Sequence, residues 1–529
     1  MKKVDSRTGN PALVWGKLLA PPHRLRGNLA MQLVTSFIDS IDGNHIAEGV
    51  RLPSSRTLAE TLHVGRNTVI AAIDELVEQG YLVSKDRSGV FVARGKRNQE
   101  RLLHDDRAAH AVNWVERLSL PCATNCAGNP SLEEVPVAYD FKYGQFDMST
   151  FPTAHWRQCE RSALDLAEIA EWGRDMFDRD DESLVESLRK HVLPNEGMWA
   201  HPDEILVTLG GQEGRYLVAQ LLCKAGVSAG MEHPGMPDMN DIISATPARR
   251  VYLPIDEEGV CLSPELKQCD VAFMTPGHQC PTTAVMSQER RLAILDAARR
   301  RDMILVEDTY QTEYVDRGIA APTMKALDSD GRVIYIGSLS KSIAPGLRVG
   351  FVVAPKVVIR ELREIRRLMH RHPPGNIQRA LAMFIDRGYY ESYLRKVSQE
   401  MTRRSQILQQ AIEKWLPEAT AAHCQGAATF WVKVPGLADA RLFCDELRMH
   451  GVLVDSGNRF FYKTPSASYL LLAVSRIQAQ HIEAGIELIS SVRSKWAGLQ
   501  KNNILGCQRG VSSMEPTLFE MQDVKFKSR

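Results

Sequence analysis

The sequence predicts two folded parts: a small helical module with a two-stranded wing, followed by a larger α/β domain. Three observations lead to this prediction. The chain has 529 residues, more than one hydrophobic core usually serves. Residues 28–94 alternate helical periodicity with tight turns and end in a hairpin pattern. From residue 138 onward, short apolar runs alternate with helical stretches, which is typical of a mostly parallel, buried sheet.

The small module contains three predicted helices. The first begins near Asn28, where apolar residues start to recur on one face. Ser54 is a suitable N-cap for a short second helix. Gly65 can cap a third helix over residues 66–79, which Gly80 ends. The residues expected on the inner faces of the second and third helices are Leu58, Ala59 and Leu62, and Val69, Ile70, Ile73, Leu76 and Val77.

Residues 81–93 have the pattern of a strand, a turn and a strand, so the module is predicted to be a winged helix-turn-helix. In such modules the third helix enters the major groove by its N-terminal end. Its first turn carries Arg66, Asn67 and Thr68, and Arg and Asn can pair with guanine and adenine edges. The side chains expected to contact phosphates are Arg56 on the second helix and Lys85 and Arg87 on the wing.

The distribution of charge agrees with DNA binding by this module. The net charge is +1, but residues 1–97 hold 14 Lys and Arg against 9 Asp and Glu. The rest of the chain holds 51 Lys and Arg against 55 Asp and Glu. A basic head on a mildly acidic body indicates that the head meets a polyanion.

The stretch "LPSSRTLAETLHVGRNTVIAAIDELVEQGYLVSKDRSGVFVA" closely resembles the GntR family of bacterial regulators. The resemblance implies that the partner is a double-stranded DNA operator. The family usually has a serine before the recognition helix; Gly65 stands there, which removes a side-chain cap but keeps the geometry. The DNA-contacting residues implied by the resemblance are Arg56, Arg66, Asn67, Thr68 and the wing glycine, Gly89.

Other features bound the class of protein. No apolar run is long enough to span a bilayer, and "MKKVDSRTGN" lacks the apolar core of a signal peptide. We therefore expect a cytoplasmic protein with no membrane partner. The ten cysteines are scattered without a framework, as reduced thiols would be. Cys122 and Cys126 have no second pair nearby, and structural zinc requires four ligands, so no metal site is expected.

We expect four parts along the chain. Residues 1–94 form the DNA-binding domain. Residues 95–137 lack regular periodicity and are rich in charges and turn formers, which indicates a linker. Residues 138–495 form the α/β domain, and residues 496–529 are expected to be a flexible tail.

Polar residues follow the predicted strands of the α/β domain, at the edge where open sheets bind ligands. Gly210 and Gly211 follow one strand and precede a helix, whose free backbone N–H groups could hold a phosphate. Asp308 ends the apolar run "MILVED", and Tyr310 lies two residues further on. A carboxylate in such an apolar setting needs a cationic partner, and a protonated pyridine nitrogen would be one.

The stretch "SLSKSIAPGLRVG" supplies a third group of polar residues. Lys341 could form a Schiff base with an aldehyde, and Ser338 and Arg348 could bind a phosphate. Pyridoxal phosphate (PLP) offers an aldehyde, a pyridine nitrogen, a ring hydroxyl and a phosphate, and an Asp on the ring nitrogen keeps it protonated. The three groups in this order favour a PLP site.

Residues 138–495 resemble the fold-type I aminotransferases, and with the head attached the whole chain resembles the MocR subfamily of GntR regulators. The resemblance implies a large, mostly parallel sheet domain, a small C-terminal α+β lobe and a homodimer. It also implies that Lys341 carries PLP as a Schiff base, with Asp308 at the pyridine nitrogen and Tyr310 at the ring hydroxyl. The residues implied around the phosphate are Gly211, Gln212, Ser338 and Arg348.

Three positions depart from the aminotransferase pattern. Met236 stands where an aromatic ring usually stacks on the cofactor, and Cys280 where an Asn often holds the ring hydroxyl. Leu471 replaces the arginine that binds a substrate carboxylate. Arg459 or Arg476 could substitute for it, but both are expected to lie elsewhere. These departures argue against an efficient transaminase and against an effector held by its α-carboxylate.

Three functions stay open from the sequence. The first is a PLP-binding transcriptional regulator that senses PLP or an amine effector, with at most a residual transaminase half-reaction. The second is an active PLP-dependent aminotransferase with an accessory DNA-binding head. The third is a regulator whose body no longer binds PLP and serves as a dimerisation module.

Overall fold

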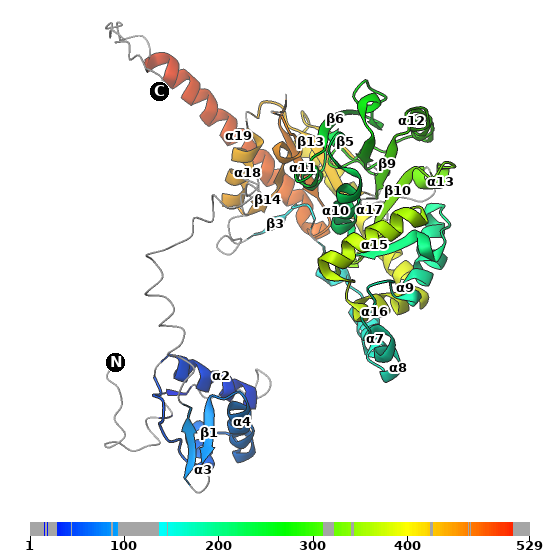
Figure 1. The fold of residues 1–529 in the computed structure, drawn as a ribbon. Helices are drawn as coiled ribbons and strands as arrows, with labels where there is room; N and C mark the ends of the chain where they lie inside the picture. The colour runs from blue at the N-terminus through cyan, green and yellow to red at the C-terminus, as the bar shows by residue number, and fades with distance from the viewer. Residues whose placement is uncertain are drawn as a thin grey trace, which may run out of the picture. The chain divides into compact units, whose positions relative to one another are not determined.

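The chain forms two compact units, Met1–Ser119 and Leu120–Arg529 (Figure 1). Almost all of the predicted linker, residues 95–137, lies outside the described residues. The computed structural model describes residues 15, 18–19, 29–43, 45–85, 88–93, 137–144, 146–309, 322–339, 343–423, 427–437, 439–463, 465 and 467–510.

The first unit is the winged helix-turn-helix that the sequence predicts. Its two strands pair antiparallel, from Leu82 opposite Val92 to Lys85 opposite Gly89. Ser54 caps the second helix by accepting a 3.2 Å hydrogen bond from the N–H of Thr57. The elements are α2 (Leu29–Asp42), α3 (Ser55–Leu62), α4 (Arg66–Glu78), β1 (Leu82–Lys85) and β2 (Gly89–Val92).

A separate hydrophobic core holds these elements together. All three helices and both strands contribute buried apolar side chains to it. Because burying a Leu, Val or Phe side chain contributes roughly 1.5–3 kcal/mol, this core can position α4 without help from the larger unit. Its members include Leu33, Phe37, Leu58, Leu62, Val69, Leu76, Leu82 and Val92.

The second unit is built on an eight-stranded sheet in the order β4-β11-β10-β9-β8-β5-β6-β7. The pairs β10–β9, β9–β8, β8–β5 and β5–β6 are parallel, as predicted, and the edge strand β7 pairs antiparallel with β6. The strands are β4 (Ile205–Thr208), β5 (Ser228–His233), β6 (Arg249–Asp256), β7 (Gly259–Val260), β8 (Val271–Met274), β9 (Ile304–Asp308), β10 (Val333–Ser338) and β11 (Gly350–Val353).

Strand β11 is the exception inside the sheet, because it runs antiparallel to both β10 and β4. It follows β10 after residues 339–349, and a parallel return needs a crossover of a dozen or more residues, usually a helix. This antiparallel return places Gly350 opposite Ser338 on one side and opposite Thr208 on the other. The ends of three strands therefore meet at one point.

Helices cover both faces of the sheet (Figure 1). Alternate strand residues face opposite ways: Ile334 and Ile336 pack with α10 (Gly211–Leu222) and α15 (Lys356–His370), whereas Val333 packs with α12 (Gln288–Arg301). The further helices beside the sheet are α11 (Pro237–Ser244), α13 (Met324–Leu327) and α16 (Gly375–Asp386). Among the described residues, no helix is both long enough and apolar enough to cross a bilayer.

The small C-terminal lobe contains an antiparallel sheet in the order β12-β13-β16-β15. Strand β3 (Tyr139–Asp140), at the start of the body, pairs with β14 (Val452–Leu453) and so joins this lobe. The remaining elements are β12 (Thr420–Ala422), β13 (Thr429–Lys433), β15 (Asp455–Ser456), β16 (Tyr469–Ala473), α17 (Tyr389–Trp415), α18 (Ala440–Met449) and α19 (Ala479–Gly510).

Helix α19 extends beyond the predicted end of the body. We expected a flexible tail from residue 496, but the helix continues to Gly510. No proline interrupts residues 479–510, so the chain meets no residue that forbids the helix.

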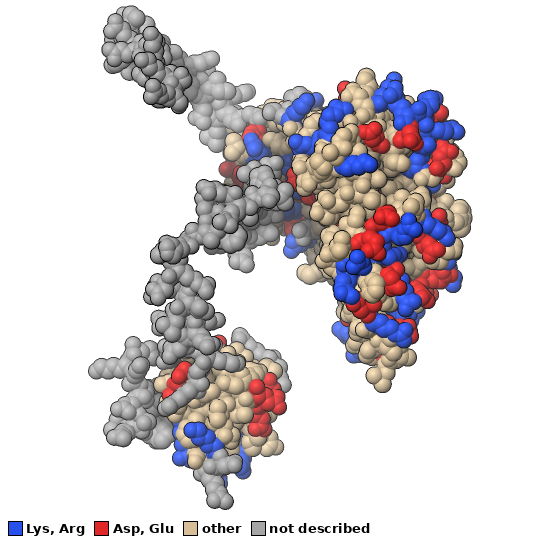
Figure 2. All heavy atoms as spheres, in the orientation of Figure 1, with Lys and Arg blue, Asp and Glu red and all other residues tan. Residues whose placement is uncertain are grey.

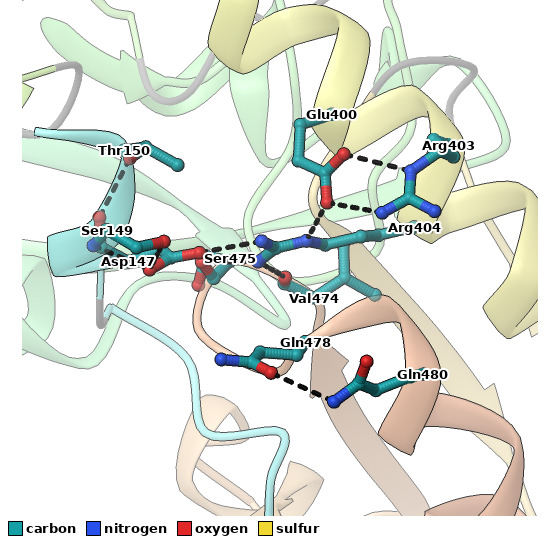
Figure 3. Close-up of polar contacts among 10 residues, drawn as sticks. All are labelled: Asp147, Ser149, Thr150, Glu400, Arg403, Arg404, Val474, Ser475, Gln478 and Gln480. Carbon is teal, nitrogen blue, oxygen red and sulfur yellow. Dashed lines mark hydrogen bonds and ion pairs between the residues drawn. The ribbon is translucent and has the colours of Figure 1, made fainter.

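A buried arginine on α17 ties the entry of the body to the small lobe (Figure 3). The Nη2 of Arg404 lies 2.6 Å from Asp147 Oδ2, and its Nε lies 2.7 Å from Glu400 Oε1. Its Nη1 donates to the carbonyls of the two residues after β16, at 3.3 Å each. Burial raises the pKa of Asp147, but hydrogen bonds from Ser149 and Arg404 outweigh it and hold that pKa below its ordinary value.

Candidate functional site

The start of α4 presents polar side chains to solvent. Arg66 and Asn67 are exposed and Thr68 is half-buried. The Nε of Arg66 donates to Ser55 Oγ at 3.4 Å, which links α4 to the start of α3. Because Gly65 at the N-cap has no side chain, it makes no side-chain capping hydrogen bond. The N–H of Thr68 donates to the Gly65 carbonyl at 3.0 Å, and the N–H groups of Arg66 and Asn67 are placed to meet a phosphate.

The predicted phosphate-contacting residues lie on α3 and the wing. Arg56 pairs with Glu60 at 3.4 Å, but their side chains are 82% and 70% exposed, so this pair is weak and leaves Arg56 free to turn. The ammonium of Lys85 lies 5.3 Å from the ring centre of Phe91 on the facing strand. Arg87 lies outside the described residues. Figure 2 shows the basic side chains of the head near α3 and acidic ones beside α4.

Two residues of the head, Arg51 and Ala72, were not recognised from the sequence. Gly89 adopts φ +105°, and a Cβ there would lie 3.0 Å from Nε of Arg51, so the wing glycine allows this arginine to approach. Ile70 was expected inside but is 39% exposed on α4. Ala72 is buried instead, because the helical period from Val69 leads to residues 72, 73 and 76. A strict application of that period would have found the error.

In the larger unit, one end of a cavity is suited to an anion. The turn before α10 places Gly210 at φ +77° and ψ 174°, and a Cβ there would lie 2.9 Å from Arg348 Nη2. That same nitrogen donates to the carbonyl of Leu209 at 2.7 Å. Ser338, at the end of β10, and Gly211, at the start of α10, line the cavity beside Arg348. Helix N–H groups and a guanidinium together favour a phosphate here.

Asp308 lines the same cavity at the end of β9 and is buried. Its Oδ2 accepts a hydrogen bond from Arg215 Nη1 at 2.5 Å. The Nη2 of Arg215 donates to Gln212 Oε1 at 2.6 Å. The sequence analysis singled out Asp308 and Gln212 but not Arg215, because nothing local in "GGQEGRYLVAQ" indicates which residue faces a strand 93 positions away.

The two other expected cofactor ligands, Tyr310 and Lys341, lie outside the described residues. The chain on both sides of Lys341 is well anchored. Leu339 N donates to the Val349 carbonyl at 3.0 Å, and the Ile343 carbonyl accepts from the Tyr393 hydroxyl at 3.2 Å. The roles of Tyr310 and Lys341 as cofactor ligands stay predictions.

The cavity has a volume of about 270 Å³. Met236 and Cys280 line it, at the positions where the sequence departs from the aminotransferase pattern. Tyr143 and Phe460 complete the wall contributed by the entry segment and the small lobe.

Arg459 also lines this cavity, so the expectation that it lies elsewhere was wrong. It stands in the short helix Gly457–Phe460 that directly follows β15, and the pairing of β15 with β16 brings that helix to the cavity. Its Nη1 lies 3.0 Å from Asp455 Oδ1, while Asp455 Oδ2 accepts from the N–H of Tyr143 at 2.8 Å. Burial raises the pKa of Asp455, although Arg459 opposes this. The side chain of Arg459 is half-exposed. Among the described residues, it is the cation that the small lobe contributes to the cavity wall.

The positions of Leu471 and Arg476 are those expected from the sequence. Leu471 is buried with Trp431 and Phe460 and presents no charge. Arg476 forms an ion pair with Asp140 at 2.8 Å and is not among the cavity-lining residues.

A second buried acid lies behind the cavity. Glu232, on β5, accepts hydrogen bonds from the N–H and hydroxyl of Thr275, at 3.0 and 2.6 Å, and from Gln279 at 3.2 Å. Burial raises the pKa of Glu232 to about 7, with the charge of Asp308 adding a smaller contribution in the same direction. The sequence analysis missed this acid because its strand position gives no sign of a hydrogen-bonding partner.

Comparison with known families covers both units. Residues 145–482 match the family described as aminotransferase class I and II, and residues 29–92 match the bacterial regulatory proteins of the gntR family. The chain is 35% identical over 470 residues to the HTH-type transcriptional regulator TauR of Rhodobacter capsulatus, covering 88% of this chain and 95% of that one. It is 28% identical over 492 residues to the probable rhizopine catabolism regulatory protein MocR of Rhizobium meliloti, covering 91% and 96%.

Solved structures resemble the body in fold. The kynurenine aminotransferase of Pyrococcus horikoshii, solved with PMP, matches with a TM-score of 0.64 and 22% identity over 75% of this chain and 98% of that one. LysN, an α-aminoadipate aminotransferase of Thermus thermophilus, matches with a TM-score of 0.65 and 20% identity over 73% and 100%. The body thus has the aminotransferase fold with its large mixed sheet.

Proposed function

Because this chain belongs to the MocR subfamily of GntR transcriptional regulators, we propose that its aminotransferase-like domain binds PLP and senses a small amine. The state of the cavity then sets how the heads engage an operator. One observation supports this above all: an anion-binding end formed by Gly211, Ser338 and Arg348 and an acid, Asp308, line the same cavity.

The residues present fit the cofactor. The close approach of Arg348 to the turn at Gly210 leaves room for no Cβ, which makes a tight cradle for a phosphate. The cavity of about 270 Å³ suits a ligand at the small end of the roughly 300–1,000 Å³ that ligand pockets occupy. When bound, PLP supplies an aldehyde that reacts with amines. Lys341 is its proposed point of attachment.

Arg459 supports a finer proposal about the effector. It lines the cavity from the small lobe, with Asp455 as its one ion-pair partner among the described residues. We propose that it binds an anionic group carried by the amine, in place of the missing cation at Leu471. Arg459→Leu should weaken the response to an acidic amine while leaving PLP binding intact.

The alternative of a working aminotransferase is favoured by the acid and the anion site, which an enzyme would also need. Turnover with a panel of amino donors distinguishes it, because a sensor should produce little keto acid. The third alternative, a body that binds no PLP, predicts only the absorbance of free PLP, with no shifted band, when the protein is mixed with PLP.

The decisive experiment compares operator affinity for apo, PLP-loaded and amine-treated protein by fluorescence anisotropy at constant salt. We expect at least one state to differ several-fold from the others, because a ligand shifts an equilibrium only through differential affinity. Lys341→Ala should remove both the shifted PLP absorbance band and the differences in operator affinity. In PLP titrations, Arg348→Met should weaken binding. Arg360 is an exposed arginine on α15, and Arg360→Met is the matched control. Equal affinity in every state would overturn the coupling.

We further propose a homodimer, so that the operator contains two half-sites. Light scattering at micromolar concentration gives the mass, and footprinting gives the half-sites. A monomer would refute this part alone.

A further inference from the structure

The acid at the ring end of the cavity already has a cationic partner from the protein. Arg215, in the second turn of α10, is 8% exposed and places Nη1 2.5 Å from Asp308 Oδ2. Among the described residues it is the one cation within ion-pair distance of Asp308. Both residues line the cavity, so the pair is part of the site rather than of the remote core.

The geometry holds the guanidinium in place. Its Nη2 donates to Gln212 Oε1 at 2.6 Å, one turn earlier on α10. Its Nε is buried and has no hydrogen-bond partner among the residues that the structure describes. Burying an N–H without a hydrogen-bond partner lowers the stability of the fold. We infer that the contact of Nη1 with Asp308 compensates for this loss.

The guanidinium of Arg215 therefore balances the charge of Asp308 before any ligand binds. A guanidinium stays protonated at every accessible pH, and at contact distance in a buried site its attraction for a carboxylate exceeds its value in water. A cofactor nitrogen facing Asp308 would meet a neutralised carboxylate. The nearby Glu232 does not replace that charge, because its oxygens are taken by Thr275 and Gln279.

We propose that Arg215 is a positioning residue that neutralises Asp308 and so keeps the cofactor's ring nitrogen largely unprotonated. This inference rests on the proposed binding of PLP. An unprotonated ring is a weaker electron sink, while its aldehyde still reacts with amines. Arg215 thereby makes the cavity a receptor for amines that converts them slowly, so that the signal is not consumed.

The test measures the ring nitrogen directly. Protein loaded with ring-¹⁵N PLP is examined by NMR as wild type, Arg215→Met, Arg215→Gln and Arg215→Lys. Wild type and Arg215→Lys, which keep a cation, should give the signal of an unprotonated nitrogen. Arg215→Met and Arg215→Gln should move it toward the protonated value and raise keto-acid formation at least tenfold. Two neutral variants are used so that one misfolding protein does not end the test.

The outcomes separate this inference from the proposed function. Wild type that binds no PLP would overturn the proposed function itself. Bound PLP with a protonated nitrogen in wild type, or the same signal in all four proteins, would overturn the role of Arg215 alone. A large loss of PLP affinity in Arg215→Met and Arg215→Gln without a change in the nitrogen signal would make Arg215 a phosphate ligand and would also refute the inference.

Discussion

Substituting Gly210 by alanine tests the anion cradle most directly. At φ +77° and ψ 174°, Gly210 occupies a backbone region that only glycine adopts readily, so a Cβ costs roughly 1–3 kcal/mol of stability. The added Cβ would also lie 2.9 to 3.2 Å from three guanidinium atoms of Arg348. Because that side chain is flexible, it would move rather than the backbone, and its 2.7 Å bond to the Leu209 carbonyl would be lost.

We therefore expect Gly210→Ala to lower the free energy of unfolding by about 1–3 kcal/mol and PLP affinity by at least tenfold. Gly226→Ala is the matched control, since Gly226 also has a positive φ, +88°, but no atom within 4 Å of the built Cβ. Gly226→Ala should lower stability but leave PLP affinity unchanged. Urea denaturation and absorbance titration with PLP provide the two readouts. Unchanged PLP affinity in Gly210→Ala would refute the assignment of this turn and Arg348 to the phosphate.

Three further predictions concern Arg66 in the head, the buried acid Glu232, and the ion pair between Arg404 and Asp147. Arg66→Ala should cost about 1–3 kcal/mol on the operator and blur one base preference, measured by anisotropy across a salt series; an equal loss on random DNA would make Arg66 a phosphate contact. The folded body should keep Glu232 protonated after the unfolded chain has ionised, so stability should fall as pH rises from roughly 4.3 toward the folded pKa of about 7. Glu232→Gln should remove that decline in urea midpoints, and an unchanged pH profile would contradict the assignment. Arg404→Met should cost about 3–5 kcal/mol by stranding Asp147, and Arg404→Met combined with Asp147→Leu should recover much of it in thermal denaturation.

Local signals account for what could be predicted. The N-cap at Ser54, the Gly-Gly turn before α10 and the apolar run ending at Asp308 all depend on residues adjacent in sequence. Each predicted its element, and the last two also marked the ends of strands β4 and β9 as places where a ligand could bind. The meeting of these ends then follows from the rule that parallel strands share their C-terminal edge.

Non-local pairings account for what was missed. The direction of β11 depends on the short connection from β10, and the expectation of a mostly parallel sheet did not anticipate it. The place of Arg459 depends on the register between β15 and β16, and the sequence analysis, which considered Arg459 and Arg476 as substitutes for the cation missing at Leu471, expected both to lie elsewhere.

The sequence by itself determined the two units, their fold classes and the groups that a phosphate-bearing cofactor would need, because periodicity, caps and turn chemistry act over a few residues. Only the tertiary structure decided that Arg215 faces Asp308 across 93 positions, and that Arg459 rather than Arg476 reaches the cavity. These contacts depend on strand order and on the rotation of a helix about its axis, and packing of the whole domain sets both.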